Sequence, residues 1–452
     1  MSAARAVVGE GTAPMRPGTL FLVPGENLLT GLRDFKAHYP DHTSLEEDLL
    51  TVASAIYACD VAFKRGEREE ITRSIELHIP VVNHAAFEAL KLELELLLWI
   101  LSDDNWTITF HRVDGQPEAK RDWAVSPGGA TILFSGGVDS FAGATELLSE
   151  KGVAGVQLAS HVTGNRITRQ SQEALAAFLE TTFGPGLHRI SVRTGGRNRG
   201  TYSYPPDSER EDTQRTRSFM FLTIAALAAR RSGHRELVVI AENGQMAINL
   251  PLSSARVGAF STHTAHPEFV ARASEYLGRL LDTAFTIQNP YLYVTKAEVV
   301  AGLTTGTRSA LGSSVSCWRG ARVFSSVNHC GECVPCLVRR IAFEYNGIRL
   351  PEYKRDLFAD DVPSLPEDHE GKRNLVELAS FAYLFATETE AALEYRFPDL
   401  INTEFDKSQA ITMYRRFANE AETVLRRYTG PARLLPPRPS PKRAATKKGG
   451  AQ

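Results

Sequence analysis

The chain has 452 residues and a formal net charge of −2; 43% of its residues are hydrophobic and 23% are charged. This is the composition of a soluble globular protein, and the length predicts two or three domains. The longest apolar candidate, residues 90–101, contains three charged residues and is too short to span a bilayer. The near-neutral charge gives no overall sign of nucleic-acid binding. The N-terminal residues lack the apolar core of a signal peptide, so we expect a cytoplasmic protein.

The first 125 residues mix helical and strand patterns. Residues 1–17 are small, polar and rich in glycine, which predicts disorder. Residues 18–125 are predicted to form an α+β domain, because apolar residues recur at helical spacing in some segments and alternate in others. The expected helices are residues 45–64 and 85–101, and the expected strands are residues 73–82 and 106–113. Residues 114–129 are polar, contain two prolines, and are predicted to form a linker.

Between residues 126 and 345 strand patterns alternate with helical ones. The expected strands are residues 130–134, 153–162, 187–192 and 236–242, and the expected helices are residues 141–150, 168–182 and 213–231. This alternation predicts a parallel sheet with helices on both faces. Residues 193–212 are rich in turn-forming residues and predict a mobile loop. Residues 346–429 are predicted to be helical, whereas the basic, low-complexity residues 430–452 predict disorder.

The hexapeptide Ser-Gly-Gly-Val-Asp-Ser, residues 135–140, follows the first strand of this alternation and precedes a helix. Ligands bind at the carboxyl ends of parallel strands, and the two glycines let the backbone turn and let a ligand approach the amides. Those amides and the positive end of the helix favour an anion. The two serines add hydroxyl donors, and Asp139 could cap the helix or support a magnesium ion. The hexapeptide therefore predicts phosphate binding of a non-Walker type; a glycine turn followed by a helix cap is the alternative.

Four of the five cysteines lie within twenty residues, with twelve, two and two residues between them: Cys317, Cys330, Cys333 and Cys336. In a long chain without export signals, this clustering favours a metal over disulfides. Four thiolates suit tetrahedral zinc in a closed structural site, and His329 is a possible substitute ligand. Four buried free cysteines, or a catalytic redox pair, are the alternatives. Cys59 stands in an apolar helical pattern, where core packing is expected.

The hexapeptide matches the PP-loop of ATP pyrophosphatases, which cleave ATP between the α and β phosphates and adenylate a substrate. With the segment Ser-Cys-x(12)-Cys-Gly-x-Cys-x-x-Cys-x-x-Arg-x-x-Ala-Phe, the chain resembles the QueC family of 7-cyano-7-deazaguanine synthases from about Ala130 to Phe343. In that family ATP activates the carboxylate of 7-carboxy-7-deazaguanine, ammonia gives the amide, and a second adenylation leads to the nitrile. The resemblance implies a doubly wound, HUP-like parallel sheet, with ATP, Mg²⁺ and Zn²⁺ bound.

The resemblance also assigns residues by motif. The implied nucleotide contacts are Ser135, Gly136, Gly137, Val138, Asp139 and Ser140, and the implied zinc ligands are Cys317, Cys330, Cys333 and Cys336.

This chain departs from housekeeping members of the family in length and in its middle. Those enzymes are about half as long, and they lack anything like residues 1–125 or the helical stretch after residue 370. Where they usually carry Pro-x-Arg-Asn, this chain has Thr-Arg-Ser-Phe at residues 216–219. The length and the Ser-Thr-x-Thr-x-His-Pro segment are similar to QueC-like proteins of bacterial anti-phage cassettes, of the QatC type and of type IV CBASS operons. That similarity puts the free nitrile in doubt as the product, and an adenylated deazaguanine could instead pass to a protein or nucleic-acid amine.

Polar residues crowd the segment that follows the strand at residues 236–242, where substrate contacts are expected. They are Asn243, Arg256, Ser261, Thr262, His263, Thr264 and His266. Arg217 and Arg256 could neutralise a carboxylate or polyphosphate, and His263 or His266 could move a proton near neutral pH. The predicted catalytic residues are Asp139, Arg217, Arg256 and His263. The alternative is a Ser/Thr-rich loop held by its own backbone, with His266 starting the next helix.

Two functions of different class remain open. The first is an adenylating enzyme acting on a carboxylated deazaguanine, with ammonia or a macromolecule as acceptor and the N-terminal domain recognising the acceptor or a partner subunit. The second is a non-catalytic ATP-binding scaffold of a defence complex. A tRNA thiolation enzyme is disfavoured, because no cysteine lies between residues 60 and 316. The basic residues of the tail could touch nucleic acid, although a solvated tail is the preferred interpretation.

Overall fold

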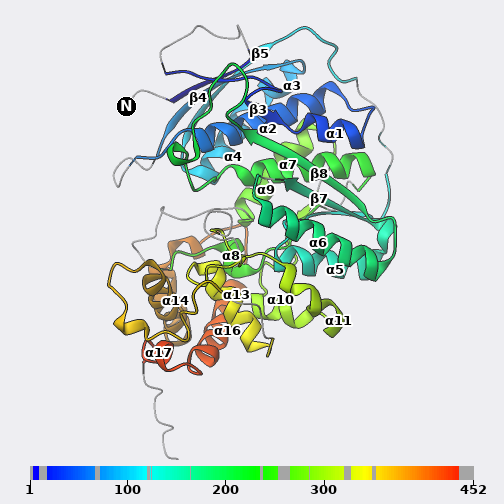
Figure 1. Cartoon of the computed structure of the whole chain (residues 1–452). Helices are drawn as coiled ribbons and strands as arrows, with labels where there is room; N and C mark the ends of the chain where they lie inside the picture. The colour runs from blue at the N-terminus through cyan, green and yellow to red at the C-terminus, as the bar shows by residue number, and fades with distance from the viewer. Residues whose placement is uncertain are drawn as a thin grey trace, which may run out of the picture.

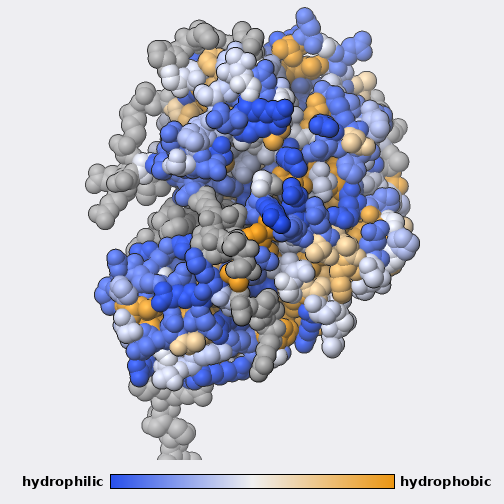
Figure 2. Space-filling view, viewed as in Figure 1, coloured by the Kyte–Doolittle hydropathy of each residue, from blue (hydrophilic) through white to orange (hydrophobic). Residues whose placement is uncertain are grey.

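The computed structural model describes residues 4–9, 18–66, 72–119, 123, 125–162, 164–234, 238–252, 265–284, 286–319, 327–348 and 353–436. Two β-sheets and their helices form the upper part of the molecule, and a group of C-terminal helices forms the lower part (Figure 1). On the face shown in Figure 2, hydrophilic residues dominate the surface of the lower left, over α14 (Glu370–Thr387). Within the described residues, no helix is both long and apolar enough to cross a membrane.

Four parallel strands form the first sheet, in the order β2-β1-β4-β5. They are β1 (Ala4–Val8), β2 (Leu20–Leu22), β4 (Ser74–Val81) and β5 (Asn105–Arg112). Alternate residues of β4 are buried, as the period of a half-buried strand requires. They share one core with α2 (Ser44–Ala62), α3 (His84–Ala89) and α4 (Lys91–Ser102). The strands and helices predicted for this region are confirmed, the second helix as two helices that meet at Leu90.

The prediction of disorder for residues 1–17 is wrong for β1. Its residues Ala6, Val7 and Val8 are almost fully buried, and the strand lies between β2 and β4. A run of five residues is too short to show a period, and the partner strand β4 lies some seventy residues away, where Ala6 pairs with Leu77. The stabilising contacts of β1 are therefore tertiary. The other residues of the predicted segment, 1–3 and 10–17, lie outside the described residues.

Six strands form the second sheet, in the order β10-β9-β6-β7-β8-β3, and every neighbouring pair is parallel except β3 with β8. The strands are β3 (Leu28–Thr30), β6 (Ala130–Leu133), β7 (Val156–Val162), β8 (His188–Gly196), β9 (Val238–Val239) and β10 (Ile287–Gln288). Leu158 of β7 packs in one core with α5 (Val138–Lys151) and α6 (Arg166–Phe183), whereas its neighbour Ala159 packs with α2 and α7 (Arg217–Ser232). The predicted parallel sheet with helices on both faces is confirmed.

The strand order creates a topological switch point at the carboxyl ends of the second sheet. The chain runs from β6 outward to β7 and β8, and then returns to the other side of β6 for β9 and β10. Connections that leave in opposite directions open a ligand crevice at such a switch point. The hexapeptide 135–140 follows β6, and Glu242 and Asn243 follow β9. The fold therefore brings two of the predicted polar segments to the switch point.

The prediction of a loop for residues 193–212 is wrong at its start, because β8 continues to Gly196. Residues of β3, from the N-terminal region, pair with this extension, with Leu28 opposite Gly196. The glycines suggested a turn, but a Cβ on Gly196 would lie 2.0 Å from the ring of Tyr204. Glycine is needed here because an aromatic ring packs flat on the strand, which the sequence pattern does not reveal.

Short helices connect the second sheet to a helical C-terminal region with its own buried core. The remaining helices are α1 (Leu32–His38), α8 (Gly244–Ile248), α9 (Pro267–Leu280), α10 (Lys296–Gly302), α11 (Thr305–Arg308), α13 (Val334–Tyr345), α15 (Glu390–Arg396), α16 (Lys407–Leu425) and α17 (Thr429–Ala432). The prediction of disorder for residues 430–452 is wrong for its first residues, because Gly430 and Pro431 are buried in α17. Residues 437–452 lie outside the described residues.

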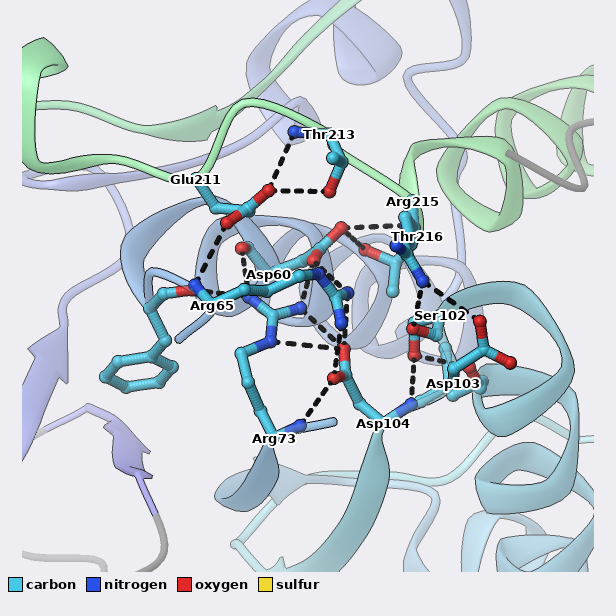
Figure 3. A network of polar contacts seen from close by, with 12 residues as sticks. Asp60, Arg65, Arg73, Ser102, Asp103, Asp104, Glu211, Thr213, Arg215 and Thr216 are labelled. Carbon is cyan, nitrogen blue, oxygen red and sulfur yellow. Dashed lines mark hydrogen bonds and ion pairs between the residues drawn. The ribbon is translucent and has the colours of Figure 1, made fainter. Parts of the chain in front are cut away.

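A buried ionic network joins the N-terminal region to the segment before α7 (Figure 3). Asp60 and Asp104 have no exposed surface, and Arg73 donates to both carboxylates at 2.5 Å. Arg65 pairs with Asp104 at 2.7 Å, and Thr216 donates to Asp60. Buried carboxylates must be paired to remain charged, so these residues fix the two regions to each other.

We expect Arg73→Met to destabilise the protein by roughly 3–5 kcal/mol, because it leaves a buried carboxylate without its partner. Chemical denaturation would measure the change. The matched control is Arg279→Met, which breaks a half-exposed pair with Glu93 and should cost less than about 1 kcal/mol. Equal losses in the two variants would contradict a special role for the buried network.

Candidate functional site

The hexapeptide forms a tight loop between β6 and α5. Gly136 has a φ of 81°, and a Cβ there would lie 2.9 Å from Ser171 Oγ of α6. The Gly136 carbonyl accepts hydrogen bonds from Ser171 Oγ at 2.7 Å and from Val315 N at 3.0 Å. The glycine is therefore required both by its left-handed backbone and by the closeness of α6.

The start of α5 offers an anion site. Gly137 is the N-cap, and among the described residues no side chain caps this helix end. The first amides of a helix lack intrahelical acceptors and carry the positive end of its dipole. The hydroxyls of Ser135 and Ser140 lie 3.1 Å apart in the same loop, and Ser140 Oγ also lies 3.3 Å from Gly137 O. Free amides and two hydroxyls at the switch point suit a phosphate group.

A buried ion pair lies in the first turn of α5. Asp139 Oδ2 accepts hydrogen bonds from Lys296 Nζ and from Asn243 Nδ2, each at 2.8 Å. Burial acts to raise the pKa of Asp139, but the Lys296 charge and these hydrogen bonds bring it below its usual value. Burial and the neighbouring Asp139 charge raise the pKa of Glu242 well above its ordinary value. The pKa values of the two carboxyl groups are therefore shifted in opposite directions, that of Asp139 toward the ionised form and that of Glu242 toward the protonated form.

Lys296 was missed by the sequence reasoning. It is the first residue of α10, whose start is marked by a capping box of Thr295 and Glu298. A cation at a helix N-terminus opposes the helix dipole, and only 6% of this lysine is exposed. A lysine directly after a capping threonine is the signal that could have identified it, since such a position is unfavourable without an anionic partner.

The C-terminal region supports the start of α10. Thr295 Oγ1 donates to Glu420 Oε1 of α16 at 2.7 Å, and Glu420 is buried. Burial raises the pKa of Glu420 to about 7; the charge of Glu298 adds to this rise, while the Thr295 hydrogen bond and Arg416 oppose it. Glu420, with a pKa near neutrality, is thus bonded to Thr295, the residue that directly precedes Lys296.

The four cysteines come together as predicted. All are buried, and their sulfur atoms lie within 4.8 Å of one another. The Cys330–Cys336 and Cys317–Cys333 sulfur distances are 3.9 Å. Zinc–sulfur bonds of about 2.3 Å in a tetrahedron require sulfur–sulfur distances of about 3.8 Å. The cluster therefore fits a structural zinc ion, which these four residues would hold.

The local chain is shaped for this cluster. Gly331, between two of the cysteines, has a φ of 81°, and a Cβ there would lie 1.9 Å from the Arg355 carbonyl oxygen. The amides of Glu332 and Cys333 point to Cys330 Sγ at 3.4 and 3.3 Å, as expected at a thiolate. His329 is not part of the four-residue cluster, and its Nε2 accepts a hydrogen bond from Ser316 N. Cys59 is fully buried, and burial raises the pKa of its thiol, in line with core packing.

Arg339 connects the cysteine cluster to residues 135–140, which we call the phosphate loop after their predicted role. It is 1% exposed, and it donates to the hydroxyls of Ser314 and Ser316 at 2.9 and 3.2 Å. Between these serines, Val315 N binds the Gly136 carbonyl. Burial lowers the pKa of Arg339 to about 10, so the side chain stays charged at neutral pH. The helix that carries Cys336 therefore supports the loop through three consecutive residues.

Of the other predicted catalytic residues, only Arg217 lies within the described residues. Arg217 begins α7 and lies beside Phe221 and Gln214, near the carboxyl end of β7. Arg256 and His263, with Ser261, Thr262 and Thr264, lie outside the described residues. His266 caps α9 by accepting from Glu268 N, which confirms the alternative that it starts the next helix.

The fold and the site define the protein as a mixed α/β protein with a glycine-rich loop at the switch point of a parallel sheet and a four-cysteine cluster. Residues 203–347 match the family described as Queuosine biosynthesis protein QueC. This match supports a relationship with the QueC family, although it covers about a third of the 452 residues and begins after the phosphate loop. A search of curated proteins found no match.

We expect Cys333→Ser to lose zinc and solubility, because a closed site needs all four thiolates to hold the fold. Metal analysis of the purified protein would measure one zinc ion per chain in the wild type and much less in the variant. Cys59→Ala is the control and should keep its zinc. Full zinc retention by Cys333→Ser would exclude a structural site at the cluster.

Glu420 should make the protein less stable as the pH rises through about 7. Its folded pKa lies above the ordinary value of 4.5, so between these values the folded state keeps a proton that the unfolded state has lost, and stability falls with rising pH until the folded state loses this proton too. Glu420→Gln should remove this dependence. The free energy of unfolding of the variant, relative to that of the wild type, should therefore rise by at most about 1.4 kcal/mol per pH unit. Denaturation from pH 5 to pH 8 would test this. The half-exposed Glu390, changed to Gln, is the control, and parallel curves for wild type and Glu420→Gln would refute the prediction.

Proposed function

We propose that the protein is a QueC-like ATP pyrophosphatase that adenylates the carboxylate of a 7-deazaguanine and passes it to a nitrogen nucleophile. The observation that carries this proposal is the position of the loop 135–140. It lies at the switch point of the sheet, beside the buried Asp139–Lys296 pair, in a chain whose residues 203–347 match the QueC family. A phosphate site of this type, without a Walker lysine, suits ATP cleavage that releases pyrophosphate.

The phosphate side of the crevice would be built from residues 135–140 and Lys296. The β and γ phosphates would bind the uncapped amides and hydroxyls of the loop, with the lysine charge close by. The carboxyl groups of Asp139 and Glu242 lie within hydrogen-bond reach of each other, and two neighbouring acids beside a phosphate site would suit a magnesium ion, which would neutralise phosphate charge when bound.

The chemistry would take place in two displacements. An oxygen of the substrate carboxylate attacks the α phosphorus, and the bond from that phosphorus to the bridging oxygen breaks, so pyrophosphate leaves. Arg217 or Arg256 would offset the charge that develops, and His263 would handle a proton. A nitrogen nucleophile then attacks the carbonyl carbon, and AMP leaves. The cysteine cluster takes no part in these steps and supports the loop through Arg339.

The substrate, the acceptor and the biological setting rest on the sequence resemblance. A deazaguanine carboxylate is the substrate that the QueC match favours. A role in anti-phage defence, with a protein or nucleic-acid amine as acceptor, rests on the chain length and on residues 249–269, and we propose the cytoplasm as the place of action. The N-terminal region, outside the family match, would recognise the acceptor or a partner subunit.

The test is pyrophosphate release combined with mass spectrometry, using purified protein, ATP, magnesium and 7-carboxy-7-deazaguanine, with and without ammonia. A nitrile product would identify an ordinary synthase of queuosine biosynthesis. Pyrophosphate without nitrile, or an adduct on a protein, would support conjugation. Nucleotide binding without any pyrophosphate would reject the proposal in favour of an ATP-binding scaffold.

We expect Ser140→Ala and Asp139→Ala to reduce pyrophosphate release by at least about 100-fold, because they remove groups that hold the phosphates or the metal. Ser149→Ala, on the same helix with its hydroxyl bonded to the Thr145 carbonyl, is the control and should keep normal activity. Circular dichroism would check that Ser140→Ala is folded. Normal release by both loop variants would remove the loop from the mechanism.

A further inference from the structure

The turn that carries Arg217 is held from outside by α2. Thr216 is the N-cap of α7, and its side chain makes no cap hydrogen bond with that helix. Its amide and its hydroxyl both donate to Asp60 Oδ2 of α2, at 2.8 and 3.1 Å. A carboxylate near a helix N-terminus satisfies orphan amides and favours the dipole. An acid of the N-terminal region therefore caps α7 in place of the helix's own residue.

Asp60 is itself fixed by the buried network of Figure 3. Its other oxygen accepts from Arg73, and Arg73 is bonded to Asp104 in turn. The neighbouring Arg215 is 2% exposed and donates to the Ser102 carbonyl and to Asp103 at 3.0 Å. The residue that precedes the cap is thus held by the end of α4, which leaves the turn little freedom relative to the N-terminal region.

Tyr57 holds the same turn from one helical turn earlier on α2. Its hydroxyl donates to Gln214 Oε1 at 3.1 Å, and Arg217 Nη1 donates to the same oxygen at 3.1 Å. Gln214 has a φ of 48°, a backbone conformation that residues other than glycine rarely adopt. Residues three apart on a helix lie on one face, so Tyr57 and Asp60 act together on residues 214–217.

The held arginine and His161 both contact the ring of Phe221. The Arg217 guanidinium lies 4.8 Å from the Phe221 ring, which is 5.3 Å from the ring of His161. His161 is 5% exposed, and its Nδ1 has no hydrogen-bond partner within the described residues, while Nε2 lies 2.7 Å from Thr194 Oγ1. Burial, with the Arg217 charge, lowers the pKa of His161 to about 3. A neutral imidazole with one free nitrogen and a partly exposed cation thus share this end of β7.

The backbone at this end of β7 lies next to the loop 135–140, while the His161 ring lies on the side of α2, with its centroid 5.6 Å from that of the Tyr57 ring. Gln172 Nε2 lies 3.3 Å from the carbonyl oxygens of both Phe134 and His161. Beyond the last ladder pair, Leu133 with Ala159, Phe134 N donates to the Ala159 carbonyl and Ser160 Oγ donates to the Phe134 carbonyl, each at 2.8 Å, so the end of β7 stays beside the chain up to the start of the hexapeptide. A substrate that reaches the α phosphorus of a nucleotide on the loop would meet this end of β7.

We propose that α2 is part of the active site, with Tyr57 and Asp60 as positioning residues that hold Arg217 at the substrate side of the crevice beside His161. The positions of the groups do not depend on the proposed function, but the substrate that Arg217 would meet, a carboxylate, rests on it. Neither positioning residue lies in the segment that matches the QueC family.

Hydrogen exchange tests the geometry without any substrate. Tyr57→Phe and Asp60→Asn should speed exchange of the amides of residues 216 and 217 by about fivefold, the effect of losing one hydrogen bond. The matched control is Tyr204→Phe. The Tyr204 hydroxyl also binds α2, at the Ala58 carbonyl, but it does not contact residues 214–217, so exchange there should stay unchanged. Unchanged exchange in Tyr57→Phe and in a folded Asp60→Asn overturns the proposal.

Steady-state kinetics tests the consequence. Tyr57→Phe should raise the KM for 7-carboxy-7-deazaguanine about fivefold or more, while the KM for ATP, the melting temperature and the zinc content stay at wild-type values. Arg217→Lys should show the same separation, and Tyr204→Phe should not. Equal changes in both KM values, or faster exchange with an unchanged carboxylate KM, would overturn the active-site role. A wild-type protein that releases no pyrophosphate would reject the proposed function, and the exchange result would still decide whether α2 holds Arg217.

Discussion

The buried ion pair between Asp139 and Lys296 is the interaction on which the crevice depends. Asp139 lies in the first turn of α5, where an acid complements the helix dipole, but Lys296 begins α10, where a cation opposes it. Both are buried, and a buried charge without a partner is costly. Each residue therefore requires the other, and two helices that follow different strands begin at one point. Burial and the charge of Asp139 raise the pKa of Glu242 well above its ordinary value, although the charge of Lys296 opposes this rise.

Two segments outside the family match reach helix starts at this crevice from opposite parts of the chain. From the N-terminal region, Asp60 of α2 caps α7. From the C-terminal region, Glu420 of α16 accepts from Thr295, the cap of α10. In both cases a buried acid fixes the residue just before a cation, Arg217 or Lys296. The segments are thus integrated with the crevice, because their removal would leave buried capping groups without partners.

The sequence predicts the features that depend on local pattern. The alternation of strands and helices predicts the parallel sheet, and the cysteine spacing predicts the cluster, because both are encoded in neighbouring residues. What it does not predict depends on distant contacts. The strand β1 is stabilised by β4, and the end of β8 by β3. The only local signal for Lys296 is its place directly after a capping threonine, and its partner follows from the fold, which places it 2.8 Å from Asp139. Arg256 and His263 stay predictions, since they lie outside the described residues.

The phosphate loop and the family match identify separate parts of the chain, and the structure shows why they belong to one site. The match begins after residues 135–140 and includes the cysteine cluster. From that cluster, α13 presents Arg339 to Ser314 and Ser316, and the residue between these serines binds the Gly136 carbonyl. Gly136 cannot change its conformation without losing that bond and the one from Ser171. A metal ion that fixes the start of α13 would therefore also fix the phosphate loop. This indirect support of the loop would explain why a structural zinc site lies close to it.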